Sequence, residues 1–229
     1  MGRIFSDAAK FRFEATGLTA MLDKTRGAGE DVYGRYARSA AYQSEVSPAE
    51  AVARMTEFAA AGYGETEIPK GIESLFNVML ASRGEVTAGG AADLGISLHR
   101  AFGGAGVDLA SLLDTAVSAA NRFPMTIGKV RDALGYATEA AVQADQTLEE
   151  TLIAICSIMP ITKTASKAGT ITRNAIISLA RPKGQRILQD LGVMPKDAAG
   201  NMRPIMDVFL EISKMLEAVA GDDDSVLMM

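Results

Sequence analysis

The two side chains best suited to covalent chemistry are the single histidine, His99, and the single cysteine, Cys156. A histidine within hydrogen-bond reach of a thiol can activate that thiol as a nucleophile. Each residue, however, lies within an apolar helical pattern, and Cys156 is flanked by Ile155 and Ile158. These surroundings are typical of an inert, buried thiol. We therefore expect neither residue to be catalytic, and one histidine cannot form a histidine-rich metal site within one chain.

A glycine-rich run, Gly103-Gly104-Ala105-Gly106, has the composition of a phosphate-binding loop. Such a loop follows a strand, and a P-loop also ends in Gly-Lys-Ser or Gly-Lys-Thr. Here a helical pattern precedes the run, and Asp108 stands close to where a lysine is required. Because its carboxylate repels phosphate, we interpret the run as a turn between two helices.

Two charged clusters remain as candidates for ion or partner binding. The run Asp222-Asp223-Asp224 lacks the alternating oxygen ligands and the final glutamate of a calcium loop, so a solvated helix end is expected. The second cluster is basic and fits either an acidic partner or simple surface solubility; it contains Lys163, Lys167 and Arg173, around Ser166 and Gly169. The sequence thus predicts no catalytic, cofactor-binding or metal-binding residue, and no enzyme.

The composition favours helices that pack through small side chains. Of the 229 residues, 48% are hydrophobic and only 6% aromatic, with 22 glycines, 12 methionines and no tryptophan. The formal net charge of −5 provides no general positive field for nucleic acid, so direct sequence-specific binding is not expected. The most apolar run, residues 152–161, is about half the ~20 residues needed to cross a bilayer. We interpret it as a buried helix that Pro160 ends.

Apolar residues recur at helical spacing along most of the chain, and no stretch has the period of two expected of a strand. Capping boxes are predicted at Ser47–Glu50 and Thr147–Glu150. The predicted helices cover residues 48–62, 65–83, 87–102, 109–123, 127–143, 148–159, 170–180 and 182–191, and a last one follows Pro204. The predicted fold is all-α, an irregular antiparallel bundle of about eight or nine helices joined by short turns.

Three regions are expected along the chain. Residues 1–44 form a charged lead-in with one or two short helices, residues 45–220 form a helical core module, and residues 221–229 form an acidic and apolar tail. Near the end of the core, Gly200 and Asn201 can adopt positive φ, and Pro204 pre-sets the first turn of a helix. This segment therefore predicts a fixed corner that directs the last helix outwards.

Short motifs occur in a fixed order through the predicted core. They are Pro48-Ala49-Glu50-Ala51, Phe58-Ala59-Ala60-Ala61-Gly62-Tyr63, Asp108-Leu109-Ala110, Leu148-Glu149-Glu150-Thr151, Ser166-Lys167-Ala168-Gly169-Thr170, Ser178-Leu179-Ala180-Arg181-Pro182, Leu188-Gln189-Asp190-Leu191-Gly192-Val193, and Asp197 with Gly200-Asn201 and Arg203-Pro204. This succession, from about Ser47 to Leu216, resembles the core region of the tail tape measure proteins of tailed phages and prophages. The chain departs from that family at residues 159–165, where glycines are frequent in the family and a stiffer turn is expected here.

The resemblance implies a structural protein that lies in the lumen of the virion tail, sets tail length and leaves the tail during DNA delivery. It implies assembly in the host bacterial cytoplasm, with the tail tube protein, tail assembly chaperones and tail-tip proteins as partners. Self-association and transient membrane contact stay open. The alternatives are a membrane-active helical protein that aids phage DNA entry, and a free-standing helical adaptor.

Length limits what the chain can measure by itself. At 1.5 Å per residue, 229 residues span at most roughly 340 Å as one unbroken helix. A compact module is shorter still. We therefore expect the chain to be a fragment of a tape measure protein or the product of a truncated gene.

Overall fold

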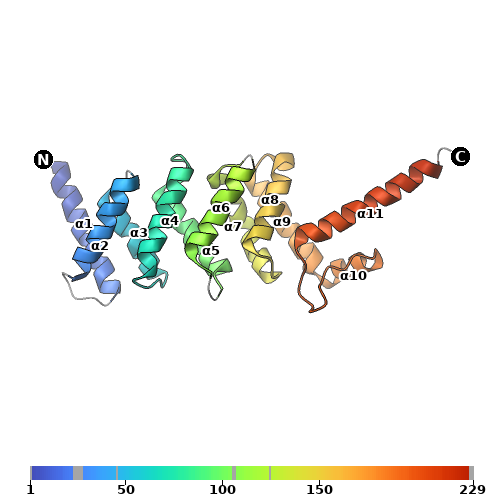
Figure 1. Cartoon of the computed structure of the whole chain (residues 1–229), viewed down its shortest axis with the longest axis horizontal. Helices are drawn as coiled ribbons and strands as arrows, with labels where there is room; N and C mark the ends of the chain where they lie inside the picture. The colour runs from blue at the N-terminus through green and yellow to red at the C-terminus, as the bar shows by residue number, and fades with distance from the viewer. Residues whose placement is uncertain (1, 23–27, 45, 105–106, 124, 227–229) are drawn as a thin grey trace. The chain divides into compact units, whose positions relative to one another are not determined.

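The computed structural model describes residues 2–22, 28–44, 46–104, 107–123 and 125–226. These residues form eleven α-helices and no β-strand, which confirms the predicted all-α class. The helices are α1 (Gly2–Met21), α2 (Ala28–Ser44), α3 (Pro48–Ala60), α4 (Glu67–Ala81), α5 (Ala88–Phe102), α6 (Leu109–Arg122), α7 (Ile127–Gln143), α8 (Leu148–Thr162), α9 (Ala165–Ala180), α10 (Pro182–Asp190) and α11 (Ile205–Val226) (Figure 1). The predicted number of helices, eight or nine, was lower than the eleven found in the described residues. The lead-in holds two helices of 20 and 17 residues rather than short ones.

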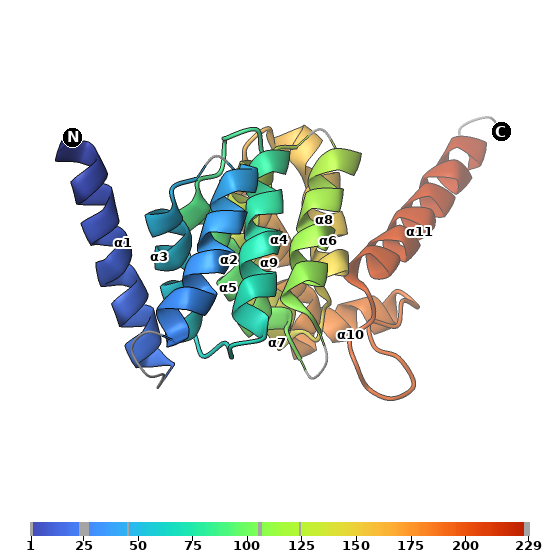
Figure 2. The same cartoon turned by 60° about the vertical axis from the view of Figure 1, so that its left-hand side comes forward.

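The contacts divide the chain into two compact units, which are described separately. Unit 1 comprises Met1–Asn121 with Thr126–Gly128. Within it, α3 contacts α1, α2, α4 and α5, and the ribbons of α1 and α2 run beside α3 (Figure 2). The core contains Val52, Met55 and Phe58 from α3 and Ile72 and Leu75 from α4, each at most 1% exposed. The buried apolar side chains of α3 and α4 therefore belong to one core.

Unit 2 comprises Arg122–Met125 with Lys129–Met229. Within it, α9 packs on α8, α10 packs on α9, and the start of α11 packs on α8. Four apolar α7 residues recur at intervals of three or four and are all at most 2% exposed; they are Val130, Leu134, Ala137 and Ala141. Their shared burial follows from the 3.6-residue period of the apolar pattern.

One of the two predicted capping boxes is complete. The amide of Thr147 donates to Glu150 Oε2 over 2.7 Å, and the amide of Glu150 donates to Thr147 Oγ1 over 3.2 Å. At Ser47 the described bonds include only the first half, in which the amide of Glu50 donates to Ser47 Oγ over 3.1 Å. Both helices nevertheless begin where their capping residues predict.

Two predicted helix boundaries were wrong. The α8 helix does not end at Pro160 but continues to Thr162, and Lys163 then adopts the left-handed conformation with φ 61°. A proline in the last turn removes one hydrogen bond without preventing the turn itself. The α9 helix begins at Ala165 rather than at Thr170, because Gly169 lies inside the helix instead of interrupting it.

Candidate functional site

His99 lies on α5 in unit 1 and contacts an aromatic side chain. The rings of His99 and Tyr63 have centroids 5.0 Å apart, and Tyr63 meets Phe58 edge-on at 5.1 Å. Burial first, and the nearby charge of Glu67 second, raise the pKa of Tyr63 to about 12. The structure therefore places His99 in a packed aromatic group.

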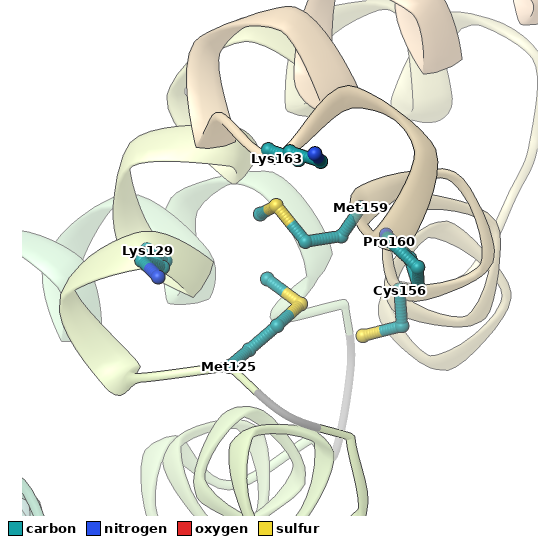
Figure 3. A pocket seen from close by; sticks show the side chains of 6 residues that line it. All are labelled: Met125, Lys129, Cys156, Met159, Pro160 and Lys163. Carbon is teal, nitrogen blue, oxygen red and sulfur yellow. The ribbon is translucent and has the colours of Figure 1, made fainter.

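Cys156 lies on α8 in unit 2, where its side chain is 1% exposed. It lines a pocket of about 240 Å³ together with Met125, Lys129, Met159, Pro160 and Lys163. Figure 3 shows the sulfur atoms of Met125, Met159 and Cys156 around this pocket. Burial raises the pKa of the Cys156 thiol to about 11, so the thiol is protonated at neutral pH. These surroundings agree with the predicted inert thiol.

The remaining candidate sites are parts of connections and helix ends. The α5 helix ends at Phe102 and α6 begins at Leu109. The glycine-rich run therefore lies in the connection between two helices, as predicted. Residues 105 and 106 of this run are outside the described part of the chain. The backbone of Asp222–Asp224 belongs to α11, but the side chains of this run are outside the described residues. Among the described residues, no group of three or more His, Cys, Asp or Glu side chains could hold a metal ion. That the chain has no catalytic, cofactor-binding or metal-binding residue stays a prediction.

The basic cluster is found on the surface of unit 2. Lys163, Lys167 and Arg173 are all exposed, as is Ser166, whereas Gly169 is buried at a helix contact. Each described helix is too short or too polar to cross a bilayer.

The most elaborate arrangement of polar groups is the corner before α11, which consists of residues 194–205. Its turn is built around Asp197, whose Oδ1 accepts the amides of Ala199 and Asn201, each over 2.9 Å. The amide of Asp197 in turn donates to the carbonyl of Asn201 over 2.9 Å. Gly200 has φ +90°, a conformation that side chains with a Cβ rarely adopt. The predicted positive φ is therefore confirmed at Gly200, whereas Asn201 does not adopt it.

Arg203 ties this corner to α11. Its Nη1 donates to the carbonyl of Met194 over 2.8 Å and to Glu211 Oε2 over 3.0 Å, while Nη2 donates to Glu211 Oε1 over 2.5 Å. Two parallel bonds between a guanidinium and a carboxylate fix direction as well as distance. The hydrogen bonds from Arg203 lower the pKa of Glu211, and the same bonds raise the pKa of Arg203.

Gln146, in the turn between α7 and α8, holds the first residue of α11. Its Oε1 accepts the amide of Ile205 over 2.8 Å, and its Nε2 donates to the carbonyl of Arg203 over 3.2 Å. The side chain is buried, and the residue is 5% exposed. The role of Gln146 could not be predicted from the sequence, because its partners lie 57 and 59 residues away and no local pattern indicates them.

Two glycines, Gly169 in the ordered motifs and Gly184 on α10, allow helix backbones to approach closely. A methyl carbon added at Gly169 would lie 2.2 Å from the carbonyl oxygen of Ala133 on α7. One added at Gly184 would lie 1.9 Å from the carbonyl oxygen of Ser178 on α9. Real carbon–oxygen contacts are never this short, so both positions require glycine. The motif around Gly169 thus fixes the α7–α9 contact, and Gly184 fixes the α9–α10 corner.

Beyond the corner, α11 leaves the rest of unit 2. Ile205 and Val208 in its first turn are 3% and 0% exposed, whereas Leu210 and Leu216 are 54% and 65% exposed. In both whole-chain views the later turns of α11 project away from α8 and α10 (Figures 1 and 2). The apolar side chains of α11 are therefore buried in its first turn and more exposed further along.

Comparison with known proteins agrees with the succession of motifs. The family model of phage-related minor tail proteins matches residues 34–227, a range that begins within α2 and includes the corner. The chain belongs to this family. The predicted relationship to tail tape measure proteins is thereby confirmed, and the match begins earlier than the expected Ser47.

Two curated relatives in this family carry more specific descriptions. The "Tape measure protein" of Pneumococcus phage Dp-1 is 29% identical over 177 residues, which are 76% of this chain and 15% of that protein. The "Probable tape measure protein" of Escherichia phage P2 is 29% identical over 143 residues, which are 62% of this chain and 17% of that protein. The chain thus covers about a sixth of the length of these relatives. No solved structure matches it.

Proposed function

We propose that this chain acts as the folded helical module of a tape measure protein. In this role it lies in the lumen of the virion tail, and the complete protein sets tail length and leaves the tail when DNA is delivered. Its partners are the tail tube protein, tail assembly chaperones and tail-tip proteins, with assembly in the host cytoplasm. The role is structural rather than enzymatic.

The observation that carries the proposal is the similarity to two tape measure proteins. The small share of each relative that is matched is consistent with a module rather than a whole ruler. The corner supplies a physical role for the module, because Arg203 and Gln146 fix the direction in which α11 leaves unit 2. A helix held in this way can continue into an extended helical body at about 1.5 Å per residue.

The first test is to sequence the DNA downstream of the codon for Met229. We expect hundreds of further codons with a helical pattern in the same reading frame. A stop codon directly after Met229 would contradict the proposal of a working ruler and would favour a truncated product or a separate adaptor.

The second test measures tail length. In-frame deletions within the helical sequence that follows α11 should shorten the tails in electron micrographs by about 1.5 Å per residue removed. Deletions of the same length in another tail gene serve as the control. Tails of unchanged length in the deletion series would show that the protein does not measure the tail.

A further inference from the structure

Unit 2 contains a long segment without acidic residues. Between Thr151 and Gln189 the sequence has no aspartate and no glutamate, although the whole chain has a formal net charge of −5. The same segment has six basic residues, all exposed; they are Lys163, Lys167, Arg173, Arg181, Lys183 and Arg186. Positive charge is thus concentrated on α9, α10 and the residues next to them.

The exposed side of α9 carries mainly basic, hydroxyl and amide groups, together with one apolar side chain, Ile171, which is 46% exposed. Lys167, Thr170, Asn174 and Ser178 follow one another at intervals of three or four residues, so they share one side of the helix. The opposite side is buried and holds Ala168, Thr172, Ile176 and Leu179. Lys163 and Arg181 stand next to the two ends of α9, and both are exposed. We use the name basic face for Lys167, Thr170, Asn174 and Ser178 together with the two exposed cations next to the ends of α9, Lys163 and Arg181, of which Lys163 also lines the pocket beside Cys156.

The cations of the basic face are not neutralised by neighbouring carboxylates. Ion pairs in the described part of the chain include Arg54–Glu57, Arg131–Asp132 and Arg203–Glu211. Lys163, Lys167 and Arg181 take part in none of them. Their charges therefore remain available to an anionic partner.

The α9–α10 corner keeps two further cations beside the basic face. The side chain of Gln185 donates to the carbonyl of Ala180 over 2.8 Å, and Gly184 allows α10 to approach Ser178 closely. Lys183 and Arg186 lie on α10 directly after this corner. The positive surface thus continues from α9 onto the first turns of α10.

We propose that the basic face binds the phosphate backbone of double-stranded DNA without sequence preference. Lysine, arginine, serine, threonine and asparagine are the side chains that contact phosphates in duplex complexes. The 16 residues of α9 extend about 24 Å. Because each strand of a duplex presents a phosphate about every 3.4 Å along the duplex axis, that length matches several of them.

Other partners fit the basic face less well. The segment from Ala137 to Val208 has no aromatic residue, so it offers no platform on which single-stranded bases could stack. A protein interface is usually centred on several aromatic or apolar anchors, whereas α9 has no aromatic residue and a single exposed large apolar side chain, Ile171. The proposal agrees with the expectation that sequence-specific binding does not occur, since backbone contacts carry no sequence information.

The test uses the full chain and short fluorescent DNA duplexes of unrelated sequence, with binding measured by fluorescence anisotropy. At about 50 mM salt we expect dissociation constants within roughly 10⁻⁴–10⁻⁶ M for every duplex, and loss of binding at about 200 mM salt. The variant Lys163→Gln/Lys167→Gln/Arg181→Gln should weaken binding at least tenfold and reduce the slope of log K against log salt by about 3. Circular dichroism checks that the variant retains the helical fold.

The matched control removes three exposed cations from unit 1, as Lys10→Gln/Arg12→Gln/Arg100→Gln. It makes the same change in net charge, so similar weakening by both variants would show a general charge effect and overturn the proposal. The absence of wild-type binding at low salt would also overturn it. Equal competition by poly-glutamate would identify an acidic protein as the partner instead. Binding to phosphatidylserine vesicles without binding to DNA would identify a lipid surface instead.

Discussion

At the residue scale, two glycines of neighbouring helices have opposite surroundings. A methyl group at Gly169 would overlap the carbonyl of Ala133, whereas nothing lies within 4 Å of one added at the exposed Gly135 on α7. Gly169→Ala should therefore lower the free energy of unfolding by about 1–3 kcal/mol, as overpacked cores do. Gly135→Ala should raise it by about 0.5–1 kcal/mol, because alanine loses less backbone entropy in a helix. Urea unfolding followed by circular dichroism compares the two, and equal effects would contradict the close α7–α9 contact.

The thiol of Cys156 allows a second prediction at this scale. Its pKa of about 11, compared with 9.0 for an ordinary thiol, leaves roughly a hundredfold less thiolate at pH 8. Alkylation by iodoacetamide should therefore be at least roughly a hundredfold slower than in the urea-unfolded chain. Mass spectrometry of samples quenched at intervals measures both rates. A native rate similar to the unfolded rate would contradict a buried, protonated thiol.

At the scale of elements, most helices after residue 44 could be predicted because their signals are local. Thr147 and Glu150 cap α8 within one turn, and Gly200 and Pro204 indicate the corner from within a few residues. What could not be predicted depends on contacts distant in sequence. The need for glycine at position 169 could not be predicted, because the α7 backbone that it contacts lies more than 30 residues away. The role of Gln146 could not be predicted for the same reason, because its partners lie at the start of α11, far away in the sequence.

Gln146 provides the test of how α11 is anchored. Gln146→Leu keeps the approximate volume but leaves the buried amide of Ile205 without its acceptor, which costs about 1–3 kcal/mol. Hydrogen exchange should accelerate at Ile205 and along the first turn of α11. The control is Gln143→Leu at the exposed end of α7, which should leave this exchange unchanged. Unchanged exchange in both variants would show that Gln146 does not hold the helix.

The Arg203–Glu211 pair makes the same anchor sensitive to pH. Because hydrogen bonds from Arg203 lower the folded-state pKa of Glu211 below its ordinary 4.5, the stabilisation is present above pH 4.5. It is lost as the pH falls through the lower folded-state value, where the carboxylate becomes protonated. Exchange in α11 should therefore accelerate at low pH, after correction for intrinsic rates. Glu211→Gln should remove this pH dependence, and a wild-type chain without it would contradict the role of the pair.

At the scale of the whole molecule, the contacts divide the chain into two units near residues 122–128. The sequence predicted a different boundary, near residue 44, and that boundary stays a prediction. The two boundaries lead to different expectations for deletion of residues 1–44. Since α3 packs against both α1 and α2, the deletion removes neighbours of the unit 1 core. If unit 1 folds as a whole, the shortened chain should lose the helical signal of unit 1 and keep that of unit 2.

Thermal unfolding followed by circular dichroism distinguishes these expectations. The fragment 129–229 provides the reference, because it retains α8 to α11 and most of α7. We expect the chain 45–229 to unfold with a cooperative transition at the same temperature as this fragment, with little additional helix. Retention of the full helical signal of α3 to α6 in the chain 45–229 would show instead that the core module is independent of its lead-in. That result would place the functional boundary at residue 44 and make α1 and α2 an accessory segment.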